Sequence, residues 1–552
     1  MNRIKTVRSP FFRGLKITAF WTLVSRLLGM VRDVATAALF GLTENGVMDA
    51  FVIAFRVPNI FRRLFGEGAL SASMLPAIAA RREADSHSVW QLVSTLLGCV
   101  FVIMAILTLV AELSCGLLWI GSQGQTEYRL VAGLSAVMLP YLLFIAMASV
   151  ASATLHAFNH FSTPAFVPVL LNSMWIITAV VIAPAWNDAP ATQAYLIAIA
   201  VLLGGILQFA VQIPVLRRFG MRWQWNWIDN YSAIFRIVRE LIPMAVGLAI
   251  LPINTLIDTA IAWIFSASNP ETPIAWLGGT VNYPLQEGTV AAIYFAERLY
   301  QFPVGLLGVV IGLVTFPALS RHATTGDRSQ FVKQMIQALR TNLFFAIPAT
   351  AGLILLAEPL TSLLFRHGAF TGTDIQRTAQ MVAAYGCGVW AYSTLPIIIR
   401  GFYAAEDSQT PFRLGMVVIV TNALVDLICI WQLGETGLAY ASAAVATLFV
   451  LLLAREAQLR WQLFAGPLID RQNKQAKNIL IITLLRSSLA TVTMYVVGYF
   501  LLRQITPVVS LSFGGRFFIV SIILICSVTL YLLVSWLLGA REWRELSRRP
   551  KR

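Results

Sequence analysis

Long apolar segments, separated by short polar breaks, run through almost the whole sequence and constrain its fold more than any other feature. A membrane-spanning helix needs about 20 predominantly apolar residues, and the chain of 552 residues is long enough for many of them. Reading apolar windows between polar breaks gives segments near residues 15–41, 48–79, 88–121, 129–156, 163–187, 190–216, 237–267, 288–320, 329–365, 375–403, 411–431, 434–456, 477–503 and 512–539. This pattern predicts an all-α polytopic membrane protein with about 14 transmembrane helices.

The composition agrees with this class and excludes a soluble protein. Only 12% of the residues are charged, against roughly 25% in soluble domains, whereas 58% are hydrophobic. A formal net charge of +15 would suggest nucleic acid in a soluble chain, but cytoplasmic loops of membrane proteins collect Lys and Arg. We therefore expect membrane lipids and no nucleic acid as partners.

The distribution of basic residues predicts the orientation in the membrane. Most Lys and Arg residues lie in the segments 1–16, 81–87, 215–240, 321–340, 400–413, 454–478 and 540–552. Because positively charged loops remain in the cytoplasm, these segments are expected there. An even number of spans then brings both termini to the cytoplasmic side, and residues 540–552 form a basic cytoplasmic tail.

The sequence contains an internal repeat. Arg56 corresponds to Arg298, and Asp33 corresponds to Asp258 once the insertion at 267–288 is allowed for. Secondary transporters are commonly built from duplicated halves. The repeat predicts an N-terminal lobe at 1–220, a C-terminal lobe at 230–460, each with six spans, and an extra helix hairpin at 477–539.

Arginines inside the first, second and eighth predicted spans are the strongest functional signal. An ionisable side chain at bilayer depth is costly and normally faces a cavity or a partner. These residues are Arg26, Arg32, Arg56, Arg62, Arg63 and Arg298. A guanidinium stays charged and donates two parallel hydrogen bonds, which suits a phosphate or pyrophosphate. They predict a cationic cavity for a phosphorylated substrate.

Interhelical ion pairs are the alternative explanation for these arginines. The carboxylates available nearby are Asp33, Asp49, Glu67 and Glu297. Six arginines against four carboxylates leave a positive surplus, which favours the cavity for the set as a whole.

Four stretches closely resemble the MurJ (MviN) family of bacterial lipid II flippases. They are SRLLGMVRD at 25–33, DAFVIAFRVPNIFRRLFGEGA at 49–69, FNHFSTPAFVPVLLN at 158–172 and AERLYQFPVGLLG at 296–308. The resemblance implies a MATE-like fold of the multidrug/oligosaccharidyl-lipid/polysaccharide exporter superfamily. It also implies translocation of an undecaprenyl-pyrophosphate-linked peptidoglycan precursor from the inner to the outer leaflet of the bacterial inner membrane.

The resemblance further implies a substrate site and a use for the extra hairpin. The cavity arginines of the family map onto Arg26, Arg32, Arg62 and Arg298, and its polar helpers onto Asp33, Asp49, Asn59 and Glu67. Family members hold the polyprenyl tail in a groove leading to the last two helices, which is the expected role of 477–539.

A second group of polar residues in the C-terminal lobe suggests a cation site. Asn422 and Asp426 are four residues apart, so that they share one helical face, and Asp258 and Ser442 lie on other spans. Carboxylate, amide and hydroxyl oxygens are ligands that suit a small hard cation. The set resembles the sodium site of some members of the family. The alternative is that Asp258 and Asp426 share a proton or cap internal hydrogen bonds.

These features predict a transporter and not an enzyme. The sequence has no phosphate-binding loop motif and no long aqueous segment, so energy would come from sodium or the membrane potential, without another cofactor. Alternating access between the lobes is the expected mechanism. A flippase for another polyprenyl-linked glycan and a cation-coupled drug exporter of the same fold are the alternatives, and cell-wall synthesis enzymes are possible partners.

Overall fold

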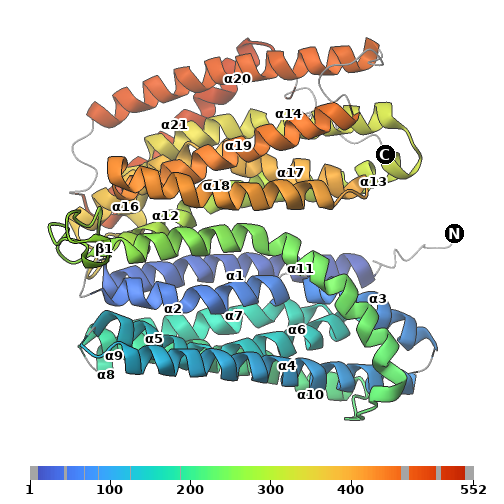
Figure 1. Ribbon diagram of the computed structural model, residues 1–552. Coiled ribbons are helices and arrows are strands. Elements are labelled where there is room, and N and C mark those ends of the chain that lie inside the picture. The colour runs from blue at the N-terminus through green and yellow to red at the C-terminus, as the bar shows by residue number, and fades with distance from the viewer. Residues whose placement is uncertain are drawn as a thin grey trace. The chain divides into compact units, whose positions relative to one another are not determined.

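The computed structural model describes residues 10–42, 46–66, 69–84, 86–124, 126–186, 188–461, 471–504, 511–540 and 542. Helices dominate these residues, which confirms the all-α prediction (Figure 1). The two strands that they contain, β1 (Ser266–Ala267) and β2 (Leu285–Gln286), form one short parallel pair.

The chain divides into two compact units, Met1–Leu256 and Ile257–Arg552. The expected boundary between lobes was 220–230, so the observed one falls later, inside the long helix α11 (Trp227–Ile264). Packing explains the difference, because Ile234 and Ile237 of α11 lie in the same apolar cluster as Val93 and Leu96. The first half of α11 therefore belongs to the first unit.

The first unit is a helical bundle. Its further elements are α1 (Pro10–Phe40), α2 (Val47–Phe61), the π-helical turn η1 (Arg62–Gly66), α3 (Ala69–Ala84), α4 (Ser86–Gly121), α5 (Thr126–Met138), α6 (Tyr141–Ala157), α7 (Ser162–Ile177), η2 (Thr178–Ile182), α8 (Ala183–Trp186), α9 (Pro190–Ala210) and α10 (Ile213–Arg218). Helix α1 packs on α7, α2 packs on α5, and α6 packs on both α4 and α9.

The second unit repeats much of this packing. Its elements are η3 (Ala275–Leu277), α12 (Thr289–Val304), η4 (Gly305–Val309), α13 (Val310–Thr324), α14 (Arg328–Leu355), α15 (Ala357–Phe365), α16 (Gly372–Gly386), α17 (Val389–Ala404), α18 (Gln409–Leu433), α19 (Glu435–Trp461), α20 (Arg471–Gln504) and α21 (Phe513–Leu537). Helix α12 packs on α16, and α17 packs on both α14 and α19. These are the pairs that correspond, in the sequence repeat, to α2 on α5 and to α6 on α4 and α9.

The repeat also extends to local backbone geometry. Helices α2 and α12 both begin after a glycine in the left-handed region, Gly46 at φ 66° and Gly288 at φ 88°. Each helix contains a proline near its end, Pro58 or Pro303, and each then continues as a π-helical turn, η1 or η4. Such turns occur frequently at functional sites.

The hairpin of α20 and α21 packs on α14 of the second unit (Figure 1). A buried ion pair holds it there, with 3.2 Å between Arg340 Nε and Glu542 Oε1. The Thr483 hydroxyl of α20 donates to the same carboxylate at 2.8 Å. The hairpin and α14 are thus joined by buried polar contacts as well as by apolar packing.

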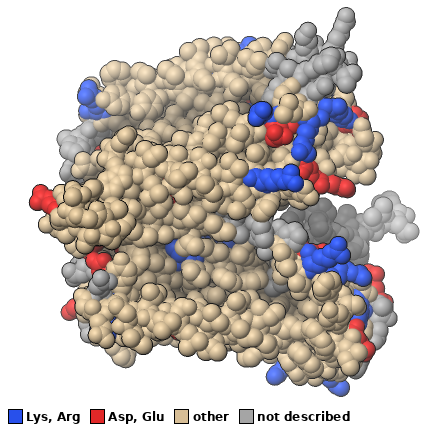
Figure 2. Space-filling model, in the orientation of Figure 1, with Lys and Arg blue, Asp and Glu red and all other residues tan. Residues whose placement is uncertain are grey.

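The surface has the character of a membrane protein. Figure 2 shows the sides of the helices almost free of charge, with Lys, Arg, Asp and Glu mostly near their ends. Within the described residues, ten helices are long and apolar enough to cross a membrane, or eleven if the bent pair α16 and α17 is one span. All fourteen expected segments coincide with helices, but fourteen membrane crossings remain a prediction.

The insertion before α12 is anchored to the second unit by Arg377 of α16. The Arg377 guanidinium donates from Nη1 to the Glu287 carbonyl at 3.0 Å and from Nη2 to Glu435 at 2.7 Å. Thr289 Oγ1 also lies 3.2 Å from Glu435. This network ties the insertion to the first residues of α12 and α19 and to the second turn of α16.

Candidate functional site

Arg32 and Asp33 form a buried ion pair on α1. Arg32 Nη2 and Nε donate to Asp33 Oδ1 at 2.7 and 3.0 Å. The residues are 7% and 3% exposed. Arg32 is therefore paired with a carboxylate, but both residues belong to α1, so this is not the interhelical pair that the alternative explanation named. A phosphate that binds Arg32 would have to share or replace this contact.

Helix α7 holds this pair in place. The amide oxygen of Asn172 accepts from Arg32 Nη1 at 3.2 Å, while its Nδ2 donates to the Ser25 carbonyl at 3.0 Å. The Arg32 guanidinium lies 4.8 Å from the centre of the Trp175 ring. Because Asn172 uses its donor on α1 and its acceptor on Arg32, it orients the arginine.

Sequence reasoning did not assign Asn172 or Trp175 to the site. The signal for Asn172 was present, since a polar amide in the apolar stretch STPAFVPVLLNSMWII is itself an intramembrane polar residue. Nothing in the sequence alone distinguishes Trp175 from the other core aromatic residues.

The junction of α2 and η1 brings Asn59 and Arg62 together. Arg62 Nη2 donates to Asn59 Oδ1 at 2.9 Å. Asn59 is buried, whereas Arg62 is half-buried. Asp49 is buried in the first turn of α2, where a carboxylate also interacts favourably with the helix dipole. Glu67, which was predicted to contribute to the same site, lies outside the described residues.

The remaining two predicted arginines differ from Arg32. Arg26 is exposed, whereas Asp33 on the same helix is buried. The assignment of Arg26 to the substrate site remains a prediction. Arg298 belongs to α12 of the second unit, is half-buried, and lies with its guanidinium 4.4 Å from the Tyr294 ring centre.

The four predicted cation ligands meet in the second unit. Asn422 Nδ2 donates to Asp258 Oδ1 at 2.6 Å and to Asp426 Oδ2 at 2.8 Å. Ser442 Oγ donates to Asp258 Oδ2 at 3.0 Å. Helices α11, α18 and α19 thus place two carboxylates, one amide and one hydroxyl in a single buried cluster.

The donor set of this cluster fits a small hard cation. Asn422 Oδ1 and Asp426 Oδ1 are buried oxygens that accept no hydrogen bond within the described part of the chain. Two carboxylates that share one amide repel each other unless a cation or a proton intervenes. The described residues include no group of three or more His, Cys, Asp or Glu side chains suited to a metal. Oxygen ligands of mixed type nevertheless remain compatible with sodium.

The helical bundles and the polar residues buried in them define a polytopic membrane transporter with the MATE fold. A solved structure titled "Lipid II flippase MurJ, inward closed conformation" matches with a TM-score of 0.73 and 24% identity, over 96% of this chain and 99% of that one. An inward-facing multidrug resistance MATE family transporter of the MOP superfamily matches with a TM-score of 0.65 and 13% identity, over 81% and 98% of the two chains.

The family model described as "Lipid II flippase MurJ" matches residues 36–532, and the chain belongs to this family. A "Probable lipid II flippase MurJ" of Vibrio cholerae is 31% identical over 470 residues, which is 82% of this chain and 84% of that protein. A "Lipid II flippase MurJ" of Burkholderia cenocepacia is 30% identical over 456 residues, or 80% and 83% of the two chains. Membership confirms the predicted family and the prediction of a multi-pass membrane transporter instead of an enzyme.

Proposed function

We propose that this protein translocates lipid II, the undecaprenyl-pyrophosphate-linked peptidoglycan precursor, from the inner to the outer leaflet. The observation that carries the proposal is the family match at 36–532, which extends through both units and into the hairpin. Two relatives of similar length are named for this activity. The alternatives of a drug exporter and of a flippase for another glycan have no such support.

The arginines supply the chemistry for the pyrophosphate. We assign Arg26, Arg32, Arg62 and Arg298 to the substrate site, with Asp33, Asp49, Asn59 and Glu67 as polar helpers. A pyrophosphate offers several oxygens to guanidinium donors, and the exchange of Asp33 for phosphate at Arg32 would couple binding to a change in α1. An arginine-rich lumen repels the organic cations that a drug exporter carries.

Alternating access, with sodium or the membrane potential as the energy source, is the proposed mechanism. The cluster of Asp258, Asn422, Asp426 and Ser442 would hold the sodium ion. A ligand shifts a conformational equilibrium only by its differential affinity for the two states, so the substrate and the ion would each favour one state. Moving one charge through 100 mV contributes about 2.3 kcal/mol, which is enough to bias the return step.

The proposal includes the cytoplasmic (inner) membrane of a bacterium as the location, with both termini in the cytoplasm. The basic segments identified in the sequence support this orientation. Cell-wall synthesis enzymes would supply lipid II on one side and consume it on the other, which makes them the proposed functional partners.

Single alanine variants of the arginines test the proposal. Arg32→Ala and Arg298→Ala should abolish translocation of the lipid-linked precursor in cells that depend on this protein, at unchanged protein level. Arg413→Ala, an exposed arginine outside the proposed site, is the matched control. Full translocation by Arg26→Ala, Arg32→Ala and Arg298→Ala would contradict the cationic mechanism.

A further inference from the structure

A pocket of about 460 Å³ lies in the second unit, away from the sites described above. It forms where α13, α14, α17 and α19 begin or end, and these helices belong to the candidate membrane spans. The pocket therefore lies at the level where the membrane-spanning helices meet the aqueous phase. Its position among the basic segments 321–340 and 400–413 places it on the proposed cytoplasmic side.

Two aromatic rings are among the apolar groups that line the pocket. Trp461 and Phe331 have ring centres 5.0 Å apart and planes at 67°. Trp461 also packs on Phe402, with 4.6 Å between ring centres. Phe331 and Phe402 are buried in the core of the unit, so the Trp461 indole packs on that core while remaining half-buried.

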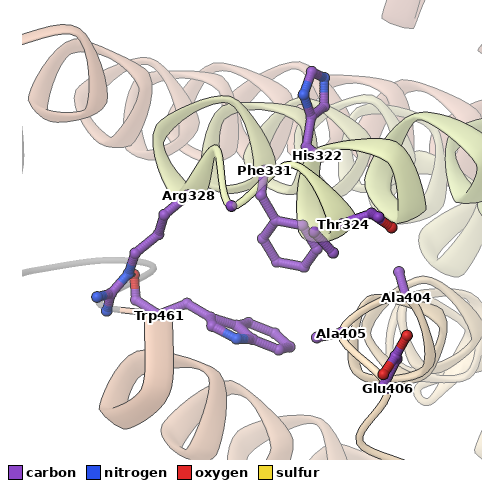
Figure 3. Close-up of a pocket in the computed structure, with 10 residues that line it drawn as sticks. His322, Thr324, Arg328, Phe331, Ala404, Ala405, Glu406 and Trp461 are labelled. Carbon is purple, nitrogen blue, oxygen red and sulfur yellow. The ribbon is translucent and has the colours of Figure 1, made fainter.

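Opposite charges lie on either side of the Trp461 ring. Figure 3 shows the Trp461 ring between Arg328 on one side and Glu406 on the other, while His322 points away. No ion pair of Arg328 or Glu406, with each other or with another residue, occurs in the described ranges. The nearby Arg460 is different, because it pairs with Asp407.

The charge of Arg328 is held in place by the end of α19. Its Nη2 donates to the Arg460 carbonyl at 2.7 Å, and its Nε lies 3.4 Å from the Trp461 carbonyl. These contacts use two of the guanidinium nitrogens and leave Nη1 as a donor for a ligand. The Glu406 side chain is exposed at the end of α17, where it is accessible to a cationic group.

A cation, an anion and an aromatic face in one interfacial pocket are complementary to a zwitterion. A phosphate would accept from Arg328, and a primary ammonium would contact Glu406 and the face of Trp461. An anionic headgroup without an ammonium would meet Glu406 unfavourably. A choline headgroup has no N–H group to donate to that carboxylate.

Apolar side chains are exposed near the same ends of α17 and α19. Tyr403 and Leu459, each one or two residues from a pocket residue, are 40% and 65% exposed. We propose that this pocket binds the headgroup of an aminophospholipid, with the phosphate on Arg328 and the ammonium between Glu406 and Trp461.

The test is lipid retention by the purified full-length protein, measured by native mass spectrometry after exchange into phosphatidylethanolamine, phosphatidylcholine or phosphatidylglycerol. We expect phosphatidylethanolamine to be retained most, and Glu406→Gln to reduce its apparent affinity about tenfold. Glu271→Gln, an exposed glutamate on the insertion, should change nothing. Equal retention of the three lipids, or an unchanged Glu406→Gln variant, would overturn the proposal.

Two further measurements distinguish a lipid headgroup from other ligands and from a loss of folding. Glu406→Lys should reverse the selectivity toward phosphatidylglycerol, and a misfolded protein would not produce this gain. Soluble phosphoethanolamine should compete only at concentrations far above those of the lipid. If it competes as well as the lipid does, the ligand is a free metabolite and the lipid proposal is wrong.

Discussion

The guanidinium of Arg32 is bound to the carboxylate of Asp33, the next residue in the sequence, with Nη2 and Oδ1 2.7 Å apart. Both side chains are buried, so the pair removes a net charge from the interior of the first unit. A substrate phosphate would compete with Asp33 for the same donors. In this structure the ion pair therefore stabilises the fold. The proposed function requires that the pair break when the phosphate binds Arg32.

Asp33→Ala should reduce the stability of the protein by about 3 kcal/mol, because it leaves a buried arginine without its carboxylate. The double variant Arg32→Gln/Asp33→Asn should recover most of that stability, since neither charge remains, but should not translocate lipid II. Thermal unfolding in detergent and complementation in cells measure the two effects separately. Translocation by the double variant would show that the pair has only a structural role.

Asp426→Asn should weaken the response of the protein to sodium. In the wild type we expect the melting temperature to rise with sodium chloride when potassium chloride keeps the ionic strength constant, because a ligand of the folded state stabilises it. The variant should need at least about tenfold more sodium, and Ser442→Ala should have a smaller effect. Asp229→Asn, an exposed carboxylate, is the control, and an equal response in all four proteins would exclude the cation site.

Gly308→Ala should destabilise the second unit by about 1 to 3 kcal/mol. A Cβ atom at this position of η4 would collide with the backbone of Ser393 in α17. Gly305, in the same turn, has open space around its Cβ direction, so Gly305→Ala should be close to neutral. Thermal unfolding of the two variants tests the close approach of η4 and α17. Equal stability of Gly308→Ala and Gly305→Ala would contradict that close approach.

Arg377 and Glu435 should show a coupling energy of about 2 kcal/mol in a double-mutant cycle. Their side chains are largely buried, and Arg377 also donates to the Glu287 carbonyl of the insertion. We expect Arg377→Ala to increase protease cleavage within 267–287, because the insertion loses its anchor. Arg366→Ala at the end of α15 is the control, and unchanged cleavage would exclude the anchoring role.

The helical class and the family could be predicted from the sequence because they depend on local properties. Apolar segments of sufficient length predict membrane helices whatever their neighbours in the fold are. The motif from Asp49 to Ala69 identifies the family from its residues alone. The position of the unit boundary could not be predicted. It depends on which neighbours Ile234 and Ile237 contact, and the sequence repeat does not contain that information.

The sequence by itself determined a polytopic membrane transporter of the MurJ family, with arginines in its early spans and oxygen-bearing side chains in its later ones. Only the tertiary structure decided the partners of these groups. It paired Arg32 with Asp33 and Asn172 while leaving Arg26 exposed, and it gathered Asp258, Asn422, Asp426 and Ser442 from three helices. The physical reason is that helical periodicity places a residue on a face, whereas the packing of helices distant in the sequence determines what that face meets.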